Sequence, residues 1–154
     1  MRLVIIFFGV LVLVAACTAS LQESDSARQA LIDYFNALEK GDYAAAAALY
    51  GGSYENLQSM NPDIDPNDHS ALLERGCTQN GLRCLPTRSV SLDEQVGDRY
   101  VFLVEFSNPD GSLFVRGPCC GASEAEMPSV SQFGYTVVNK AGDYLVQELP
   151  VYVP

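Results

Sequence analysis

The four cysteines that follow residue 76 are the residues whose side chains could carry the most chemistry. Cys77 and Cys84 are separated by six residues, and Cys119 and Cys120 are adjacent. Structural zinc sites usually build on Cys-x2-Cys pairs, and neither spacing fits that pattern. The Cys-x-x-Cys motif of redox enzymes is missing as well. The spacing therefore favours disulfides that staple loops, and we predict no metal site.

The pairing of these cysteines depends on the sheet that lies between them. Four cysteines allow three connectivities. If the three segments after Cys84 are strands that run up, down and up, Cys84 and Cys119 lie at opposite ends of the sheet, roughly 20 to 25 Å apart. The Cα atoms of a disulfide lie within about 7 Å of each other. We therefore predict a Cys77–Cys84 bond, which leaves Cys119 and Cys120 to each other as a vicinal disulfide or a reduced pair.

An acidic cluster and the single histidine are weaker candidates. Asp63, Asp65 and Asp68 resemble part of a calcium loop, but the glycine and the terminal glutamate of an EF-hand are missing and Pro66 occupies a flexible position. Helix capping by Asp65 and solvation of the other carboxylates are favoured. Because His69 is the only histidine, a Ser-His-Asp triad would have to be built around it. A surface histidine is the favoured interpretation.

Four side chains on the predicted strands are candidates for lining a pocket. Strand alternation places Tyr100, Glu105, Tyr135 and Tyr144 where polar atoms could face a cavity. Aromatic residues on a sheet more often belong to a core than to a catalytic site. We assign no catalytic residue and expect no cofactor.

Length and charge exclude several classes of protein. The chain has 154 residues, which is enough for one domain. With 19 Asp and Glu against 9 Lys and Arg, the formal charge is -10, so nucleic acid is not an expected partner. Apolar residues make up 48% of the chain and are concentrated at its beginning, so the remainder has an ordinary globular composition.

The N-terminus has the pattern of a secretory signal. Arg2 precedes an apolar run over residues 3–14, which ends before Thr18 and is too short to cross a membrane. The sequence Leu-Val-Ala-Ala-Cys at 13–17 resembles the lipobox of bacterial lipoproteins. This resemblance implies a signal peptide over 1–16, a lipid on Cys17, and an anchor on the extracytoplasmic face of the cell membrane. With Cys17 lipidated, the other four cysteines can pair completely.

The domain follows a short tether. Residues 17–25 are expected to form the lipidated tether and residues 26–154 the domain. Ser26 and Gln29 form a capping-box pattern that predicts the start of a first helix, and Gly41 predicts its end.

Further helices and then strands are expected after this helix. Asp42 predicts the cap of a second helix over 43–50, a helical turn can follow over 54–60, and Asp65 predicts the cap of a third helix that Gly76 ends. The order indicates an α+β fold, with three helices packed on a curved antiparallel sheet. Period-two alternation predicts five strands, over residues 88–96, 99–107, 113–117, 131–139 and 144–153.

One stretch carries a resemblance to a known superfamily. The sequence Phe-Asn-Ala-Leu-Glu-Lys-Gly-Asp-Tyr at 35–43 resembles the first helical hairpin of the nuclear transport factor 2-like, or cystatin-like, superfamily. Residues 117–121 and 149–154 are similar to uncharacterised bacterial lipoproteins. The resemblance implies a cone-shaped fold. Some members of the superfamily are isomerases, dehydratases or cyclases, but their catalytic residues do not map onto this sequence.

Two functions from different classes fit these observations. The first is a non-enzymatic, lipid-anchored extracytoplasmic domain that binds a small apolar ligand or a protein partner. The alternative is a pocket enzyme of isomerase or dehydratase type. A buried carboxylate facing a closed cavity would favour the enzyme, and an apolar, filled interior would favour the binding domain.

Overall fold

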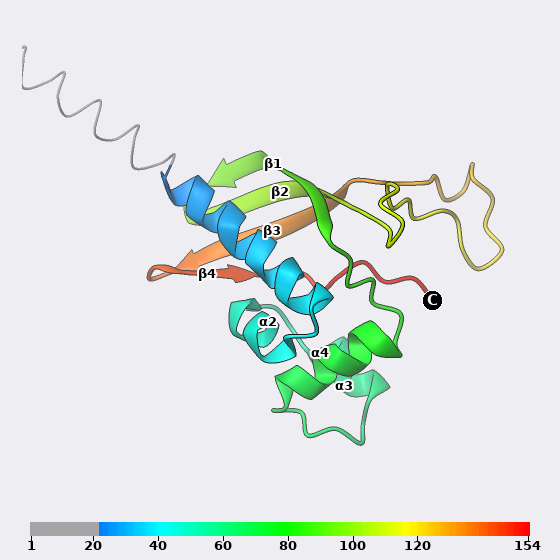
Figure 1. Cartoon of the computed structure of the whole chain (residues 1–154), viewed down its shortest axis with the longest axis horizontal. Helices are drawn as coiled ribbons and strands as arrows, with labels where there is room; N and C mark the ends of the chain where they lie inside the picture. Colours follow the sequence, from blue (N-terminus) through cyan, green and yellow to red (C-terminus); the bar gives the residue numbers. More distant parts are fainter. Residues whose placement is uncertain (1–21) are drawn as a thin grey trace, which may run out of the picture.

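In the computed structural model, which describes residues 22–154, four helices precede a four-stranded antiparallel sheet (Figure 1). The described part of the N-terminal helix covers residues 22–39. The later elements are α2 (Tyr43–Leu49), α3 (Glu55–Met60), α4 (His69–Thr78), β1 (Thr87–Val96), β2 (Arg99–Phe106), β3 (Phe133–Lys140) and β4 (Asp143–Val146).

The signal peptide predicted over 1–16 and the lipidation predicted at Cys17 lie outside the described residues. Within the described range, no helix combines the length and the apolar character that a membrane crossing needs.

The sheet is a meander in the order β1-β2-β3-β4, and each strand is antiparallel to the next. β1 and β2 are joined at residues 97–98, where Gly97 has a φ of 59°. β3 and β4 are joined through Ala141 and Gly142, whose φ angles of 57° and 103° suit a tight hairpin turn. Both turns lie where the sequence predicts them.

The N-terminal helix packs along one face of the sheet (Figure 1). The ring of Phe35 lies 4.8 Å, centroid to centroid, from the rings of both Phe106 and Tyr135. At the other end of this layer, the Tyr100 hydroxyl donates a hydrogen bond to Glu23 at 3.3 Å. Alternate residues of β2 face the helix and are buried: Tyr100, Phe102, Val104 and Phe106.

The N-terminal helix differs from its prediction at one end. Residues 22–25 are already helical, although the prediction places them before the first helix. Ser26 lies inside the helix, donating to the Gln22 carbonyl at 3.0 Å, and Gln29 bonds to Asp33 at 2.9 Å, so the capping box does not form. The bond from Tyr100 to Glu23 ties this earlier turn to the sheet. The other end is as predicted, because the helix ends at Glu39 and Gly41, two residues later, has a φ of 75°.

The third predicted helix is shifted along the chain. Asp68 caps α4 by accepting from the Ala71 N–H at 3.0 Å, whereas Asp65 accepts from the Asn67 N–H in a turn. α4 also continues past Gly76, where an added Cβ would lie 2.8 Å from the Leu82 side chain. Gly76 therefore permits close packing instead of ending the helix. Because α3 forms as a separate element, the described residues contain four helices and not three.

The prediction of five strands is also wrong. Residues 113–117 form only isolated bridges, between Ser107 and Leu113 and between Arg116 and Val130. Pro118 lacks a backbone donor, which hinders a longer ladder there. The last predicted strand ends at Val146, after which the chain leaves the sheet.

Candidate functional site

The four side chains proposed for a pocket are not gathered in one cavity. Tyr100 and Tyr135 are buried on the helix-facing side of the sheet, and Tyr144 lies beside Tyr100 with 6.1 Å between ring centroids. Glu105 is on the opposite face, where it accepts hydrogen bonds from Ser89 at 2.9 Å and Gln132 at 3.3 Å.

Aromatic rings fill the interior between the helices and the sheet. Tyr34 and Tyr54 flank Tyr50, with ring centroids 5.9 and 4.9 Å from it, and the hydroxyls of Tyr34 and Tyr54 have no hydrogen-bond partner. Burial raises the pKa of Tyr34 well above its usual range and raises the pKa of Tyr54 to about 12, so both phenols are neutral at physiological pH. Apart from tyrosines, the buried polar or charged side chains of the described residues are Asn61 and Thr136.

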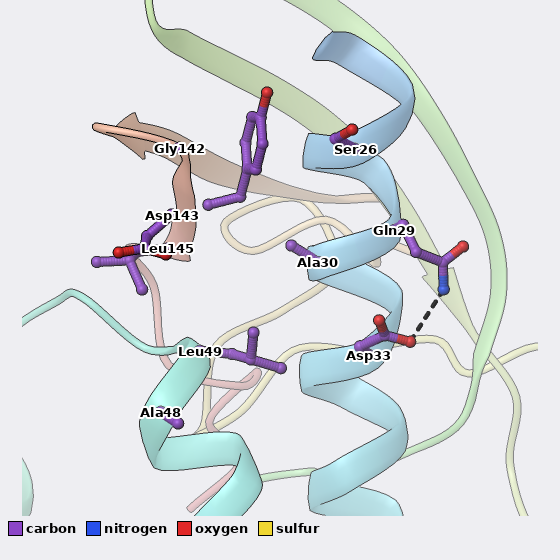
Figure 2. Close-up of a pocket in the computed structure, with 10 residues that line it drawn as sticks. Ser26, Gln29, Ala30, Asp33, Ala48, Leu49, Gly142, Asp143 and Leu145 are labelled. Atoms are coloured by element: carbon purple, nitrogen blue, oxygen red, sulfur yellow. Dashed lines mark hydrogen bonds between the residues drawn. The ribbon is translucent and has the colours of Figure 1, made fainter. Parts of the chain in front are cut away.

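An open groove of about 730 Å³ lies between the N-terminal helix, α2 and the β3–β4 turn (Figure 2). Asp33 and Asp143 lie along it, and Asp33 is already held by Gln29, as the dashed line in Figure 2 shows. Ser26 and Tyr144 complete its polar side. The groove is negatively charged, but no observation other than its acidic residues points to a ligand there.

A second cavity, of about 500 Å³, has a more apolar lining, and we call it the C-terminal cleft. Its volume falls within the range of pockets that take small organic molecules. It lies where the long segment 107–132 extends past the end of the sheet, on the side where the C-terminus is found (Figure 1). The lining consists of Arg83, residues 114–120, Met127 and residues 152–154.

Local hydrogen bonds hold the segment 107–132 that forms one wall. Arg116 and Val130 exchange backbone hydrogen bonds of 2.9 and 3.0 Å. Between them, the Glu126 carboxylate accepts from the Ser123 N–H at 2.8 Å, and Glu124 accepts from the Ser129 N–H at the same distance.

The opposite wall is the C-terminal segment, which pairs with the loop after α4. The Arg83 N–H donates to the Val151 carbonyl at 2.8 Å, and the Val153 N–H donates to the Gly81 carbonyl at 2.9 Å. This loop is closed by the Cys77–Cys84 disulfide, whose Cα atoms are 5.6 Å apart. The predicted pairing is confirmed, and the bond braces the wall that carries Arg83.

Two arginines give the cleft a positive charge. The Arg116 guanidinium carbon lies 5.7 Å from the centroid of the Phe133 ring, and its Nε is buried without an acceptor. Arg83 is exposed beside it on the rim. None of the lining residues, all of which belong to the described part of the chain, is Asp or Glu. An anion bound in the cleft would balance the charge of the two guanidinium groups.

The adjacent cysteines also line this cleft. No disulfide joins Cys119 and Cys120 in the structure, and their Sγ atoms lie 2.8 Å apart. The hydrogen bond with Cys120 raises the pKa of the Cys119 thiol, burial adds to this, and nearby Arg116 acts in the opposite direction.

The remaining predicted residues are dispersed. Asp63 is paired with Arg75, whose Nη1 donates to both carboxylate oxygens at 2.6 and 2.7 Å, while Asp65 and Asp68 belong to the separate turn and cap described above. His69 is exposed, as predicted, and stacks on Tyr54 with 3.9 Å between ring centroids. In residues 22–154, no three His, Cys, Asp or Glu side chains form a group that could hold a metal ion.

Sequence reasoning missed the two arginines of the cleft. The available signal is their proximity to cysteines, since Arg83 precedes Cys84 and Arg116 lies three residues before Cys119. The spacing alone does not show that segments more than thirty residues apart form one cavity.

Comparison of the chain with protein-family models and with curated proteins finds no match to either.

Proposed function

We propose that the protein is a non-enzymatic, membrane-anchored extracytoplasmic domain that binds a small apolar molecule with an anionic end in its C-terminal cleft. The observation that carries this proposal is the pair Arg83 and Arg116, which line a largely apolar cavity that contains no Asp or Glu side chain. A carboxylate or sulfonate would pair with these guanidinium groups and offset their charge.

The apolar part of the ligand has a matching surface. Val115 and Tyr152 line the cleft and are 49% and 46% exposed, which is high for side chains of this kind. Phe114 contributes a further ring to the wall formed by the segment 107–132. A short alkyl chain seated here would remove these side chains from water, with a gain of about 25 cal/mol per Å² of apolar surface.

The position of the cleft favours binding over catalysis. An isomerase or dehydratase of the alternative type would draw on buried tyrosines as hydrogen-bond donors. Neither of the two cavities described above is lined by Tyr34, Tyr50, Tyr54 or Tyr135. The filled interior therefore supports a binding domain whose ligand is held at the surface.

The cellular location is part of the proposal. The lipobox-like residues 13–17 support lipidation of Cys17 and an anchor on the extracytoplasmic face. A nuclear transport factor 2-like fold is proposed from the resemblance at 35–43. The N-terminal helix and α2, joined by a turn at Gly41 and Asp42, form a helical hairpin that is consistent with it. The Cys77–Cys84 bond suits an oxidising compartment.

Ligand binding is tested with two twelve-carbon probes, laurate and dodecanol, measured by displacement of a fluorescent naphthalene sulfonate from the mature chain. Laurate should bind more tightly than dodecanol. Arg116→Gln should weaken laurate by about tenfold or more, because a hydrogen bond to a charged group contributes about 1.5 to 3 kcal/mol. Arg28→Gln, on the exposed face of the N-terminal helix, is the matched control and should leave the affinity unchanged. Equal binding of both probes to wild type and Arg116→Gln would refute the proposal.

The anchor is tested by Cys17→Ser. A multiply acylated cysteine anchors a protein stably, so the substitution should release the protein from membranes or leave an unprocessed precursor. Unchanged membrane retention, together with the absence of lipid mass on the wild-type protein, would contradict the anchor without affecting the cleft.

A further inference from the structure

The backbone at the tip of the cleft brings two adjacent sulfur atoms together. Neighbouring side chains of an extended chain point to opposite sides. Here Cys120 has a φ of 61° and Gly121 a φ of 87°, and the Ala122 N–H donates to the Cys119 carbonyl at 3.0 Å. This left-handed turn places the two Sγ atoms 2.8 Å apart. A non-glycine residue in this region is uncommon and carries strain, so the convergence of the thiols is a specific feature of the turn.

A third sulfur lines the same cavity from another part of the segment. Met127 contributes to the cleft together with Cys119 and Cys120. Its N–H donates to the Ser123 carbonyl at 2.9 Å, and the preceding Glu126 caps Ser123, so the backbone that carries the thioether is held in place.

The donor set identifies the class of ion. The cleft offers two thiols and a thioether but no histidine or carboxylate side chain, so hard cations such as Mg²⁺ and Ca²⁺ lack the charged oxygen ligands that they favour. Structural zinc almost always takes four ligands. Thiolate and thioether donors select soft ions, among them Cu(I), which is satisfied by two or three of them. We propose that the C-terminal cleft binds one Cu(I) ion through the Sγ atoms of Cys119 and Cys120 and the Sδ atom of Met127.

Binding is a ligand exchange without a redox step. Each thiol releases its proton to solvent as its sulfur bonds to the ion, and copper remains Cu(I) throughout. Two thiolates and one Cu(I) carry a net charge of -1, and Arg83 and Arg116 lie in the same cleft to balance it. The inference depends on the sulfur atoms and goes beyond the proposed function, which depends on the guanidinium groups.

The test is an anaerobic titration with Cu(I) of the mature chain in which Cys77–Cys84 is bonded and Cys119 and Cys120 are free thiols, in competition with the chromophoric chelator bicinchoninate. One ion per chain should be withdrawn from the chelator. Removing a residue that hydrogen-bonds to a metal ligand typically weakens metal binding by about 10- to 100-fold. Cys119 and Cys120 would bind the ion directly, so Cys119→Ser and Cys120→Ser should each weaken binding by about 100-fold. Met127→Leu removes only a neutral donor and should weaken it by about tenfold. Met60→Leu changes a methionine that is 49% exposed and lies outside the cleft, so it should have no effect.

Three results would overturn the inference. The first is wild-type protein that fails to compete with the chelator, and the second is Cys120→Ser binding as tightly as wild type. The third is a wild-type chain that, isolated without reductant, has no titratable thiol at 119–120 and lacks four hydrogen atoms relative to the fully reduced chain. The Cys77–Cys84 bond accounts for two of these atoms, and a vicinal disulfide would account for the other two. If the serine variants fail to fold, Met127→Leu against Met60→Leu still decides the matter. Laurate binding is measured on the same samples, so failure of one proposal is distinguishable from failure of the other.

Discussion

The interface between the N-terminal helix and the sheet differs from the segment 107–132 in how each is held together. In the interface, strands pair in continuous ladders and the rings of Phe35, Phe106 and Tyr135 contact one another. In the segment, isolated bridges are supplemented by exposed carboxylates that bind backbone N–H groups. In the first arrangement, buried aromatic rings fill the space between the helix and β2 and β3. The second leaves Arg116 and two thiols at the surface, which explains why the candidate site lies where the chain leaves the sheet.

The largest expected effect is on the ring-filled interface. Phe35→Ala should lower the free energy of unfolding by about 3 to 5 kcal/mol, because it opens a cavity among rings that cannot collapse fully. Phe114→Ala, in the half-buried wall of the cleft, should cost less than half as much and weaken ligand binding instead. Urea unfolding of both variants measures this contrast. Equal losses in stability would show that the two regions are equally packed.

The disulfide is expected to rank second. Replacing Cys77 and Cys84 together with alanine should lower the free energy of unfolding by about 2 to 3 kcal/mol, as expected for the closure of a short loop. Because the bond braces the loop that carries Arg83, affinity for the probe should fall as well.

Proteolysis without a reductant also tests the Cys77–Cys84 pairing. Cleavage of the oxidised protein at Arg88 or Arg99 should yield two fragments that separate without reductant. Fragments that stay linked until a reductant is added would contradict the Cys77–Cys84 pairing.

A glycine at the C-terminal wall is expected to have the next largest effect. Gly81 has a φ of 83°, and an added Cβ would lie 2.5 Å from the Val153 carbonyl oxygen. Gly97 also has a positive φ, of 59°, but nothing lies within 4 Å of an added Cβ. Gly97→Ala should therefore show only the left-handed backbone cost, about 1 to 2 kcal/mol, and Gly81→Ala should exceed it. Thermal unfolding of the two variants measures the cost of the contact between the added Cβ and the Val153 carbonyl oxygen. A larger loss of stability for Gly97→Ala would refute this prediction.

The smallest expected effect is that of acid on the segment 107–132. Hydrogen bonds from Ser112, Ser129 and Ser123 hold the pKa values of Asp110, Glu124 and Glu126, respectively, below their usual range. A lowered pKa in the folded state contributes stability above the ordinary carboxyl pKa of about 4, and this contribution is lost as the pH falls through the lowered value.

Hydrogen exchange at pH 6 and pH 3 measures this effect. The segment 107–132 should lose protection at pH 3, whereas the amides of β2 and β3 should keep theirs. Uniform loss across the domain would show that the segment does not open independently.

Much of the fold could be predicted because the signals are local. Gly41 followed by Asp42 separates two helices through backbone conformation and a side-chain cap, and both act within a few residues. The hairpin turn at Gly97 has the same local character. The Cys77–Cys84 pairing was predicted by excluding the crossed pairings, because the strands predicted after Cys84 place Cys119 at the far end of the sheet.

Other features depended on contacts between distant segments. Asp65 and Asp68 are both good caps by type, and the packing of α4 against α2 and α3 determines which one starts the helix. Alternation over 113–117 looks like a strand, yet the partners available to it allow only isolated bridges. The pocket expected from Tyr100, Glu105, Tyr135 and Tyr144 does not form as one cavity, because β2 alternation separates Tyr100 from Glu105 by the thickness of the sheet.

By itself, the sequence determined the class of fold, the single local disulfide and the acidic character of the chain, since each depends on residue type and short spacing. The tertiary structure alone decided the site. Arg83, Arg116 and Met127 line one cavity only because the disulfide-closed loop, the segment 107–132 and the C-terminal segment lie around it. These residues come together through contacts between segments far apart in the chain, and no local sequence pattern specifies which segments pair.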